Sequence, residues 1–220
     1  MSKSPLWIFI TLGTFLGVSQ SFFFLTPIVI LLYFIFIKKI LLKDNLKDSF
    51  FAGWCFGIGF YIGSMHWIIS PFLIYEKHFL LSPISILFPL LMGLFFSLPS
   101  TLIIILKNFI YFHRISVISK GFMIANFFFI AEIIKSNIFG GLPLNLTANL
   151  WAFNHEFIQI SKFIGVMGLS FFTLFWISCI SVFLIEKKFF NSLSYKDKKN
   201  FLQKIKNLNK KIKKIYVDTS

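Results

Sequence analysis

The chain has 220 residues, of which 57% are apolar and only 14% are charged, and 33 residues are phenylalanine. A soluble domain of this composition would expose a large hydrocarbon surface to water, so soluble fold classes are excluded. The net charge of +14 does not indicate a nucleic-acid-binding protein, because half of all Lys and Arg residues follow Glu186 and no nucleic-acid-binding module is recognisable.

Apolar runs alternate with short polar segments between Leu6 and Ile185, which is the pattern of a chain that crosses a bilayer repeatedly. The pattern predicts an all-α, polytopic integral membrane protein with about six transmembrane helices. The predicted spans are 6–20, 22–37, 50–71, 82–106, 118–136 and 157–185. The first span is short, and the fourth contains three prolines that predict a kink or a tilt.

The first residues permit a second interpretation. Lys3, the apolar run after it and Gly17-Val18-Ser19 also fit a signal peptide with a small-residue cleavage site. Cleavage there would leave a terminus that begins inside another apolar run. A retained helical hairpin is therefore the favoured prediction.

The distribution of basic residues predicts the orientation, because Lys and Arg near helix ends stay on the cytoplasmic side. With a cytoplasmic N-terminus and six spans, 19 of the 22 basic residues are cytoplasmic, and only Lys77, Lys135 and Lys162 are not. We therefore expect both termini in the cytoplasm, with a transmembrane domain over 1–186 and a basic tail over 187–220. The tail fits either a lipid-binding amphipathic helix or, as favoured here, a solvated segment that fixes topology.

The third span contains glycines at helical spacing. One stripe of a helix would contain Gly59, Gly63, His66 and Ser70, and another would contain Gly53, Gly57 and Ser64. Small residues four apart predict close helix packing, and His66 and Ser70 would then face the bundle interior. For His66 and the adjacent Trp67, packing and contact with a substrate are the two alternatives.

The fifth span contains an acidic residue, Glu132, three positions before Lys135. A charge at the bilayer centre costs about 2.5 to 3.5 kcal/mol on insertion scales, which predicts an interior position or a polar cavity. We expect the two residues to pair while Lys135 reaches the outer interface. A functional role for Glu132 and simple pairing remain alternatives.

The loop 139–151 follows this span and contains Gly, Pro and Asn residues between apolar ones, which predicts irregular backbone at the outer surface. Such a loop enters the bilayer only where protein shields its backbone. Asn145 and Asn149 are candidates for amide contacts to a lipid headgroup, and an ordinary turn is the alternative.

No complete catalytic group is recognisable in the sequence. Cys55 and Cys179 lie within apolar spans without an adjacent base, which predicts inert thiols. The His residues outside the third span lack metal-ligand spacing, so neither a metal nor a cofactor is predicted.

Three segments in this order resemble the membrane half of the bacterial apolipoprotein N-acyltransferase family. They are the glycine-rich run 53–67, Glu132 with the later Gly140-Gly141-Leu142-Pro143-Leu144-Asn145, and the run 159–170 with Gly165 and Gly168. Leu142 and Leu144 depart from the aromatic residues that the family often has there.

The resemblance implies an inner-membrane protein that takes part in lipoprotein maturation. That family transfers an acyl chain from phospholipid to the amino group of a lipidated cysteine, through a nitrilase-like domain with Cys, Glu and Lys. None of these three catalytic residues is assigned in this chain. We therefore expect a truncated or separately encoded membrane domain that is inactive alone.

The implied partners are phospholipid and lipoprotein acyl chains and a nitrilase-like polypeptide, without nucleic acid. The lipid-cavity candidates are His66, Trp67, Glu132, Asn145 and Asn149. A small transporter or assembly factor that uses Glu132 and His66, and the product of a broken gene, are the competing interpretations.

Overall fold

The computed structural model describes residues 5–20, 22, 25–74, 80, 82–109, 115–138, 145–152 and 154–192. Part of the glycine-proline loop, including Leu142 and Leu144, and the tail from 193 onward lie outside these ranges. Within them every regular element is a helix and no strand occurs, which confirms the predicted all-α class. The elements are α1 (Leu6–Gln20), α2 (Thr26–Leu41), α3 (Leu46–Met65), η2 (His66–Ile69), α4 (Ser70–Ile74), α5 (Ile84–Met92), α6 (Leu94–Asn108), α7 (Val117–Ile138), η5 (Thr147–Trp151), α8 (His155–Gln159) and α9 (Ser161–Ser192).

Four helical stretches are long and apolar enough to cross a membrane. They are Leu46–Ile74, Ser85–Asn108, Val117–Ile138 and Ser161–Lys187. The first two helices stand where the sequence predicts spans, but α1 has 15 residues and α2 has 16. At 1.5 Å per residue each rises about 23 Å, less than the roughly 30 Å of a bilayer core. The described residues therefore form a helical protein with four candidate spans and two shorter helices, as expected of a multi-pass membrane protein.

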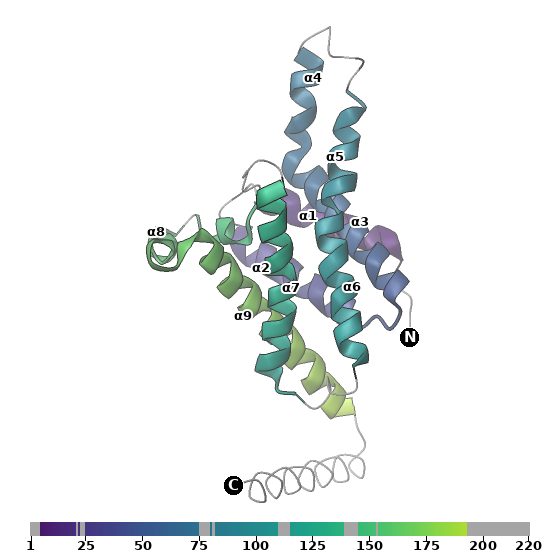
Figure 1. Ribbon diagram of the computed structural model, residues 1–220, viewed down its shortest axis with the longest axis vertical. Coiled ribbons are helices and arrows are strands. Elements are labelled where there is room, and N and C mark those ends of the chain that lie inside the picture. The colour runs from purple at the N-terminus through teal and green to yellow at the C-terminus, as the bar shows by residue number, and fades with distance from the viewer. Residues whose placement is uncertain are drawn as a thin grey trace, which may run out of the picture. The chain divides into compact units, whose positions relative to one another are not determined.

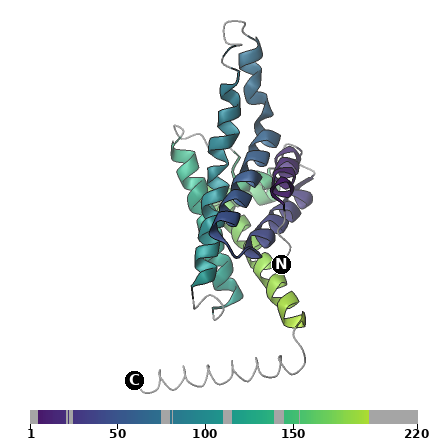
Figure 2. The same cartoon turned by 90° about the vertical axis from the view of Figure 1, so that its right-hand side faces the viewer.

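The described residues up to Val182 form one compact unit, and α9 continues beyond it. In this unit α6 and α7 lie side by side, and α1 and α2 lie behind them in the view of Figure 1. The turned view in Figure 2 shows α1 against α3. Helix α3 is therefore the central element, with α1 on one side and α5 and α6 on the other.

Glycines bring α1 and α3 into backbone contact, as the sequence predicts. The contact uses two glycines from each helix, namely Gly13, Gly17, Gly59 and Gly63. A methyl group at Gly59 would overlap the carbonyl oxygen of Ile10, and one at Gly13 would overlap that of Phe56. Only glycine permits this approach. The segment that resembles a signal-peptide cleavage site is thus a packing surface.

The second glycine stripe of α3 packs against α5 and α6. A methyl group at Gly57 would collide with the backbone of Gly93, where α5 ends and α6 begins. Ser49 Oγ donates a hydrogen bond of 2.7 Å to the Ser100 carbonyl, and Trp54 Nε1 donates one of 2.8 Å to the Leu90 carbonyl. The break at Gly93 agrees with the irregularity predicted for the proline-rich span.

The predicted inward orientation of His66 and Ser70 is wrong. The α-helix ends at Met65, and the next four residues form a 3₁₀ turn, whose three residues per turn change the direction of the stripe. His66 and Ser70 are exposed, and Trp67 is 55% exposed. Beyond this turn, α4 and α5 extend past the ends of the neighbouring helices (Figures 1 and 2).

Phenylalanines fill the space between α2, α3, α6 and α7. Phe36 stacks on Phe56 with ring centroids 3.7 Å apart, and Phe96 meets Phe56 edge-on at 5.2 Å. Phe128 closes the group from α7. Together these rings form the floor beneath the polar site described next.

Candidate functional site

The loop after α7 folds into the bundle between helices. Leu146, Thr147, Ala148 and Leu150 are all at most 4% exposed. Asn145 enters this segment with a φ of 47°, in the left-handed region that Asn tolerates better than most residues. Of the loop 139–151, for which the sequence predicts irregular backbone, residues 139–144 lie outside the described residues. Asn145 is irregular, whereas Thr147–Trp151 form the 3₁₀ helix η5, which the surrounding helices shield.

Glu132 of α7 accepts two hydrogen bonds from one residue of the loop, Thr147. The backbone N–H of Thr147 donates to Glu132 Oε1 at 3.0 Å, and the Thr147 hydroxyl donates to the same oxygen. A carboxylate within a span is stable only with such partners, and the loop supplies them.

Lys135 lies one helical turn from Glu132 but binds a different group. Its side chain is only 4% exposed, and Nζ donates to the backbone carbonyl of Asn145 at 3.3 Å. Nζ also lies 6.0 Å from the ring centroid of Tyr61, within reach of a cation–π contact. The prediction that Lys135 pairs with Glu132 and extends to the interface is wrong, since both residues are described and no ion pair joins them. The inward-folded loop offers a carbonyl that a fully exposed loop would not.

Asn145 connects the loop to α3. Its side-chain amide donates to Ser64 Oγ at 2.7 Å, and the Ser64 hydroxyl donates to the Phe60 carbonyl at 2.8 Å. Asn145 thus contributes its unusual backbone conformation, its carbonyl and its side chain to one junction.

Further hydrogen bonds attach the same loop to α1, α2 and α9. Gln20 Nε2 donates to the Leu146 carbonyl at 3.4 Å, Thr26 Oγ1 to the Leu150 carbonyl at 2.9 Å, Ala148 N to Ser170 Oγ at 3.0 Å, and Trp151 Nε1 to Thr173 Oγ1 at 2.8 Å. Five helices therefore hold one short loop. We call residues 145–152 with these polar partners the loop junction.

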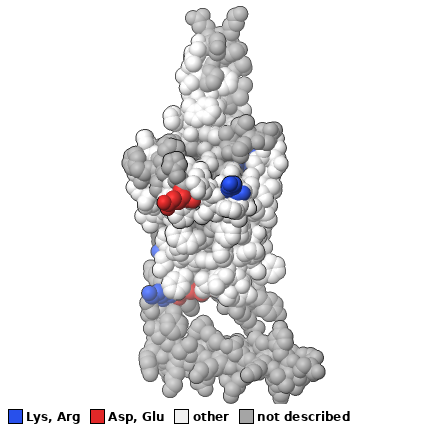
Figure 3. All heavy atoms as spheres, turned by 90° about the vertical axis from the view of Figure 1, so that its left-hand side faces the viewer, with Lys and Arg blue, Asp and Glu red and all other residues white. Residues whose placement is uncertain are grey.

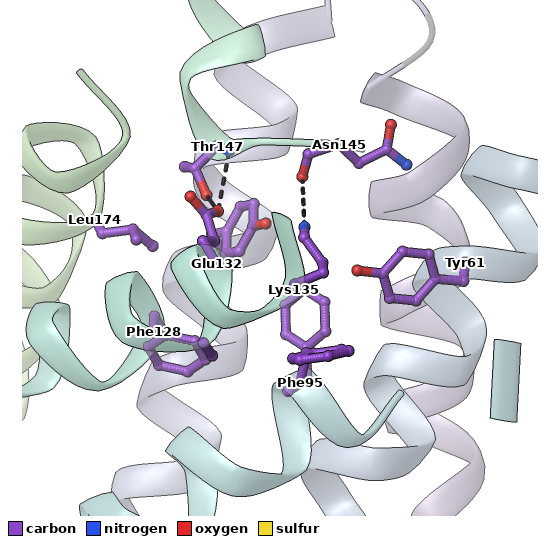
Figure 4. A pocket seen from close by; sticks show the side chains of 11 residues that line it. Tyr61, Phe95, Phe128, Glu132, Lys135, Asn145, Thr147 and Leu174 are labelled. Atoms are coloured by element: carbon purple, nitrogen blue, oxygen red, sulfur yellow. Dashed lines mark hydrogen bonds between the residues drawn. The ribbon is translucent and has the colours of Figure 1, made fainter. Parts of the chain in front are cut away.

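A small pocket lies beside Glu132 and Lys135, lined by aromatic rings from α2, α3, α6 and α7 (Figure 4). Its cavity volume is about 20 Å³, which is room for a water molecule and far too little for an acyl chain. Two buried oxygens in it, Tyr61 Oη and Glu132 Oε2, have no hydrogen-bond partner among the described residues. Figure 4 shows the Tyr61 hydroxyl pointing toward Lys135.

The structure brings together two of the five candidates, Glu132 and Asn145. His66 and Trp67 lie in the exposed 3₁₀ turn, and Asn149 is exposed on the loop, so none of these three lines the pocket. Sequence reasoning missed Thr147. Its position in the same loop, between the candidates Asn145 and Asn149, could have pointed to it. It also missed Tyr61, although that residue lies between Gly57 and Ser64 at the helical spacing of the second glycine stripe.

Neither cysteine lines the pocket. Cys55 and Cys179 are half-buried free thiols on different helices. Among the described residues no group of three or more His, Cys, Asp and Glu side chains could hold a metal ion. What the site can do is bind and orient the loop.

The fold and the loop junction define a class, namely a multi-pass helical membrane protein with an inward-folded polar loop at one end of its bundle. Residues 11–179 match the family described as apolipoprotein N-acyltransferase N-terminal domain. The chain belongs to this family, and the resemblance seen in the sequence is confirmed.

Three curated relatives, each named apolipoprotein N-acyltransferase, come from Rickettsia species. The protein of Rickettsia bellii is 26% identical over 74% of this chain and 32% of its own length. Those of Rickettsia prowazekii and Rickettsia typhi are 29% and 28% identical over 67% and 60% of this chain. The chain thus spans about a third or less of the length of these relatives. No solved structure matches it significantly.

Proposed function

We propose that this chain is the membrane domain of an apolipoprotein N-acyltransferase and works with a nitrilase-like catalytic polypeptide encoded separately. The observation that carries the proposal is the family match over residues 11–179. By itself the chain acylates nothing, because the thiols of Cys55 and Cys179 lie on separate helices away from the polar pocket.

The membrane is the bacterial inner membrane, which the chain crosses six times with both termini in the cytoplasm. The ion pair between Lys107 Nζ and Asp44 Oδ1, at 2.8 Å, supports this orientation, because it joins the two connections rich in basic residues at one end of the bundle. The loop junction then lies at the outer end. The two short helices cross as a hairpin packed against α3.

Acyl chains lie along the exposed apolar faces of the helices, because the pocket is too small to admit them. Exposed His66, Trp67 and Asn149 at the outer end are available to lipid headgroups. Glu132 and Asn145 shape the loop behind them. The domain thereby places the lipid next to the catalytic polypeptide.

The test is co-expression in a strain depleted of its own N-acyltransferase, with lipoprotein N-acylation measured by mass spectrometry of the N-terminal peptide. We expect N-acylation only when this chain and a nitrilase-like polypeptide are both present. Trp67→Ala should lower the acylated fraction severalfold at equal membrane abundance, while Ile62→Ala, on the exposed face of α3, should not. Equal N-acylation by the catalytic polypeptide alone would contradict the proposal.

A small proton-coupled transporter is the second candidate. Glu132 Oε2 lines a water-sized cavity and has no hydrogen-bond partner in the part of the chain that the structure describes, which favours this function because intramembrane carboxylates often mark proton pathways. Proton flux into vesicles that contain the purified chain, abolished by Glu132→Gln, would select this function over the first.

A further inference from the structure

Residues 155–164, which comprise α8 and the first turn of α9, are little buried. From Glu156 to Ile164 every side chain except Ser161 is exposed. The exposed apolar residues are Phe157, Ile158, Ile160, Phe163 and Ile164. Phe163 is 87% exposed. We call residues 155–164 the surface segment.

Gly165 separates this segment from the spanning part of α9. Its backbone has φ 73° and ψ 164°, a region that essentially only glycine occupies. No atom lies within 4 Å of the position of a Cβ there, so the conformation and not the packing requires glycine. The chain therefore changes direction at Gly165.

The membrane crossing does not need the surface segment. Residues 166–187 continue as helix, and at 1.5 Å per residue they rise about 33 Å, enough for a hydrocarbon core of about 30 Å. Residues before Gly165 are therefore not required inside the hydrocarbon core.

Trp151 fixes the surface segment to the loop junction. Its ring stacks on Phe157 with centroids 4.5 Å apart and an interplanar angle of 14°, while its Nε1 binds Thr173. Asn154 caps α8 by accepting hydrogen bonds from the backbone N–H groups of Glu156 and Phe157. The segment is thus an ordered helix whose position is set by the buried loop.

The charged and the apolar side chains of the surface segment together indicate the environment in which it lies. Exposed Glu156 and Lys162 disfavour the hydrocarbon core, whereas the exposed Phe and Ile side chains disfavour bulk water. Figure 3 looks onto the side on which α8 lies and shows few charged side chains on a mostly uncharged face. Only the boundary between headgroups and acyl chains accommodates both kinds of side chain.

We propose that the surface segment lies in the headgroup region of the outer leaflet and binds the phospholipid surface. The loop junction is then held at a fixed depth, because Trp151 contacts both the segment and α9. This inference goes beyond the acyl-transfer proposal and takes from it only the side of the membrane.

The test measures the depth of a spin label at Phe163→Cys in a protein without Cys55 and Cys179, reconstituted in phosphatidylethanolamine and phosphatidylglycerol vesicles. Relative accessibility to oxygen and to a water-soluble nickel chelate gives the depth. Phe172→Cys, at a position 55% exposed along the span, is the deep reference, and Lys47→Cys, at an exposed position in the first turn of α3, is the aqueous reference. We expect the label at 163 about 5 to 10 Å inside the headgroup boundary, between the two references.

A label at 163 as accessible to the nickel chelate as the one at 47 would overturn the proposal, and so would one as deep as the label at 172. Gly165→Ala should shift the depth at 163 and leave that at 172 unchanged. An unchanged depth at 163 in Gly165→Ala would contradict the bend. Because no step measures N-acylation, failure here is distinct from failure of the proposed function.

Discussion

Glu132 and Thr147 bind each other inside the bundle. Glu132 supplies a carboxylate acceptor within the span, and Thr147 supplies two donors, its backbone N–H and its hydroxyl. A buried donor without a partner costs about 1 to 3 kcal/mol, so the arrangement is stable only while both are present. The second carboxylate oxygen has no partner among the described residues and faces the pocket. Structural and proton-carrying roles for Glu132 therefore predict different outcomes for different substitutions.

Glu132→Ala should destabilise the protein by about 1 to 3 kcal/mol, because it leaves the N–H and hydroxyl of Thr147 without their acceptor. Glu132→Gln retains a side-chain oxygen and should cost less than half as much. The measurement is the midpoint of thermal unfolding in detergent. Equal losses for Ala and Gln would show that the charge itself, and not the hydrogen bonds, holds the loop.

Replacing each of the two asparagines of the loop, Asn145 and Asn149, by alanine makes the same chemical change at a half-buried position and at an exposed position. Asn145→Ala should cost about 1 to 3 kcal/mol, because alanine disfavours a φ of 47° and cannot bind Ser64. Asn145→Gly keeps the backbone freedom and loses only the amide, so it should cost less. Asn149→Ala changes an exposed side chain and should be nearly neutral by the same unfolding measurement. A cost for Asn149→Ala equal to that for Asn145→Ala would contradict the loop junction.

At the scale of elements, α3 shows which features of the fold were predictable from sequence. Helical periodicity and glycine spacing are local properties, so they predict both the spans and the contacts of Gly57 and Gly59. The orientation of His66 was not predictable, because the change to a 3₁₀ turn at Met65 alters the period. The partners of Glu132 and Lys135 depend on a loop that returns into the bundle. Spacing within one helix cannot reveal such a contact.

Gly59→Leu should separate α1 from α3 and lower stability by at least 1 to 3 kcal/mol, because the added side chain meets the backbone of Ile10. Ile62→Leu, a volume-conserving change on the exposed face of the same helix, is the matched control and should be neutral. Cross-linking between cysteines placed on α1 and α3 measures the separation directly. Unchanged cross-linking in Gly59→Leu would contradict the close contact.

The two ends of the bundle differ in the chemistry that holds them. At one end an exposed aspartate, Asp44, binds Lys107, which also donates to the Lys43 carbonyl at 2.6 Å. At the other end Glu132 and Lys135 are held inside by the loop. Exposed ion pairs contribute little stability, whereas partners of buried charges are difficult to remove without cost. The end that contains the loop junction is therefore the more sensitive to substitution, whereas the end with the Asp44–Lys107 ion pair matters chiefly for the proposed orientation.

That orientation can be tested with a thiol reagent that does not cross membranes, in protein without Cys55 and Cys179. Lys47→Cys, in the first turn of α3, should react only after the cytoplasmic membrane is permeabilised, because the proposed topology places this basic end of the bundle in the cytoplasm. Glu156→Cys, on α8, should react in spheroplasts whose cytoplasmic membrane is intact, because five proposed crossings from a cytoplasmic N-terminus place it on the periplasmic side. The ratio of labelling before and after permeabilisation is the measurement, and we expect it to be near zero at 47 and near one at 156. Labelling of both positions from the same side would mean that the short helices α1 and α2, or the spans after them, cross differently from the proposed topology.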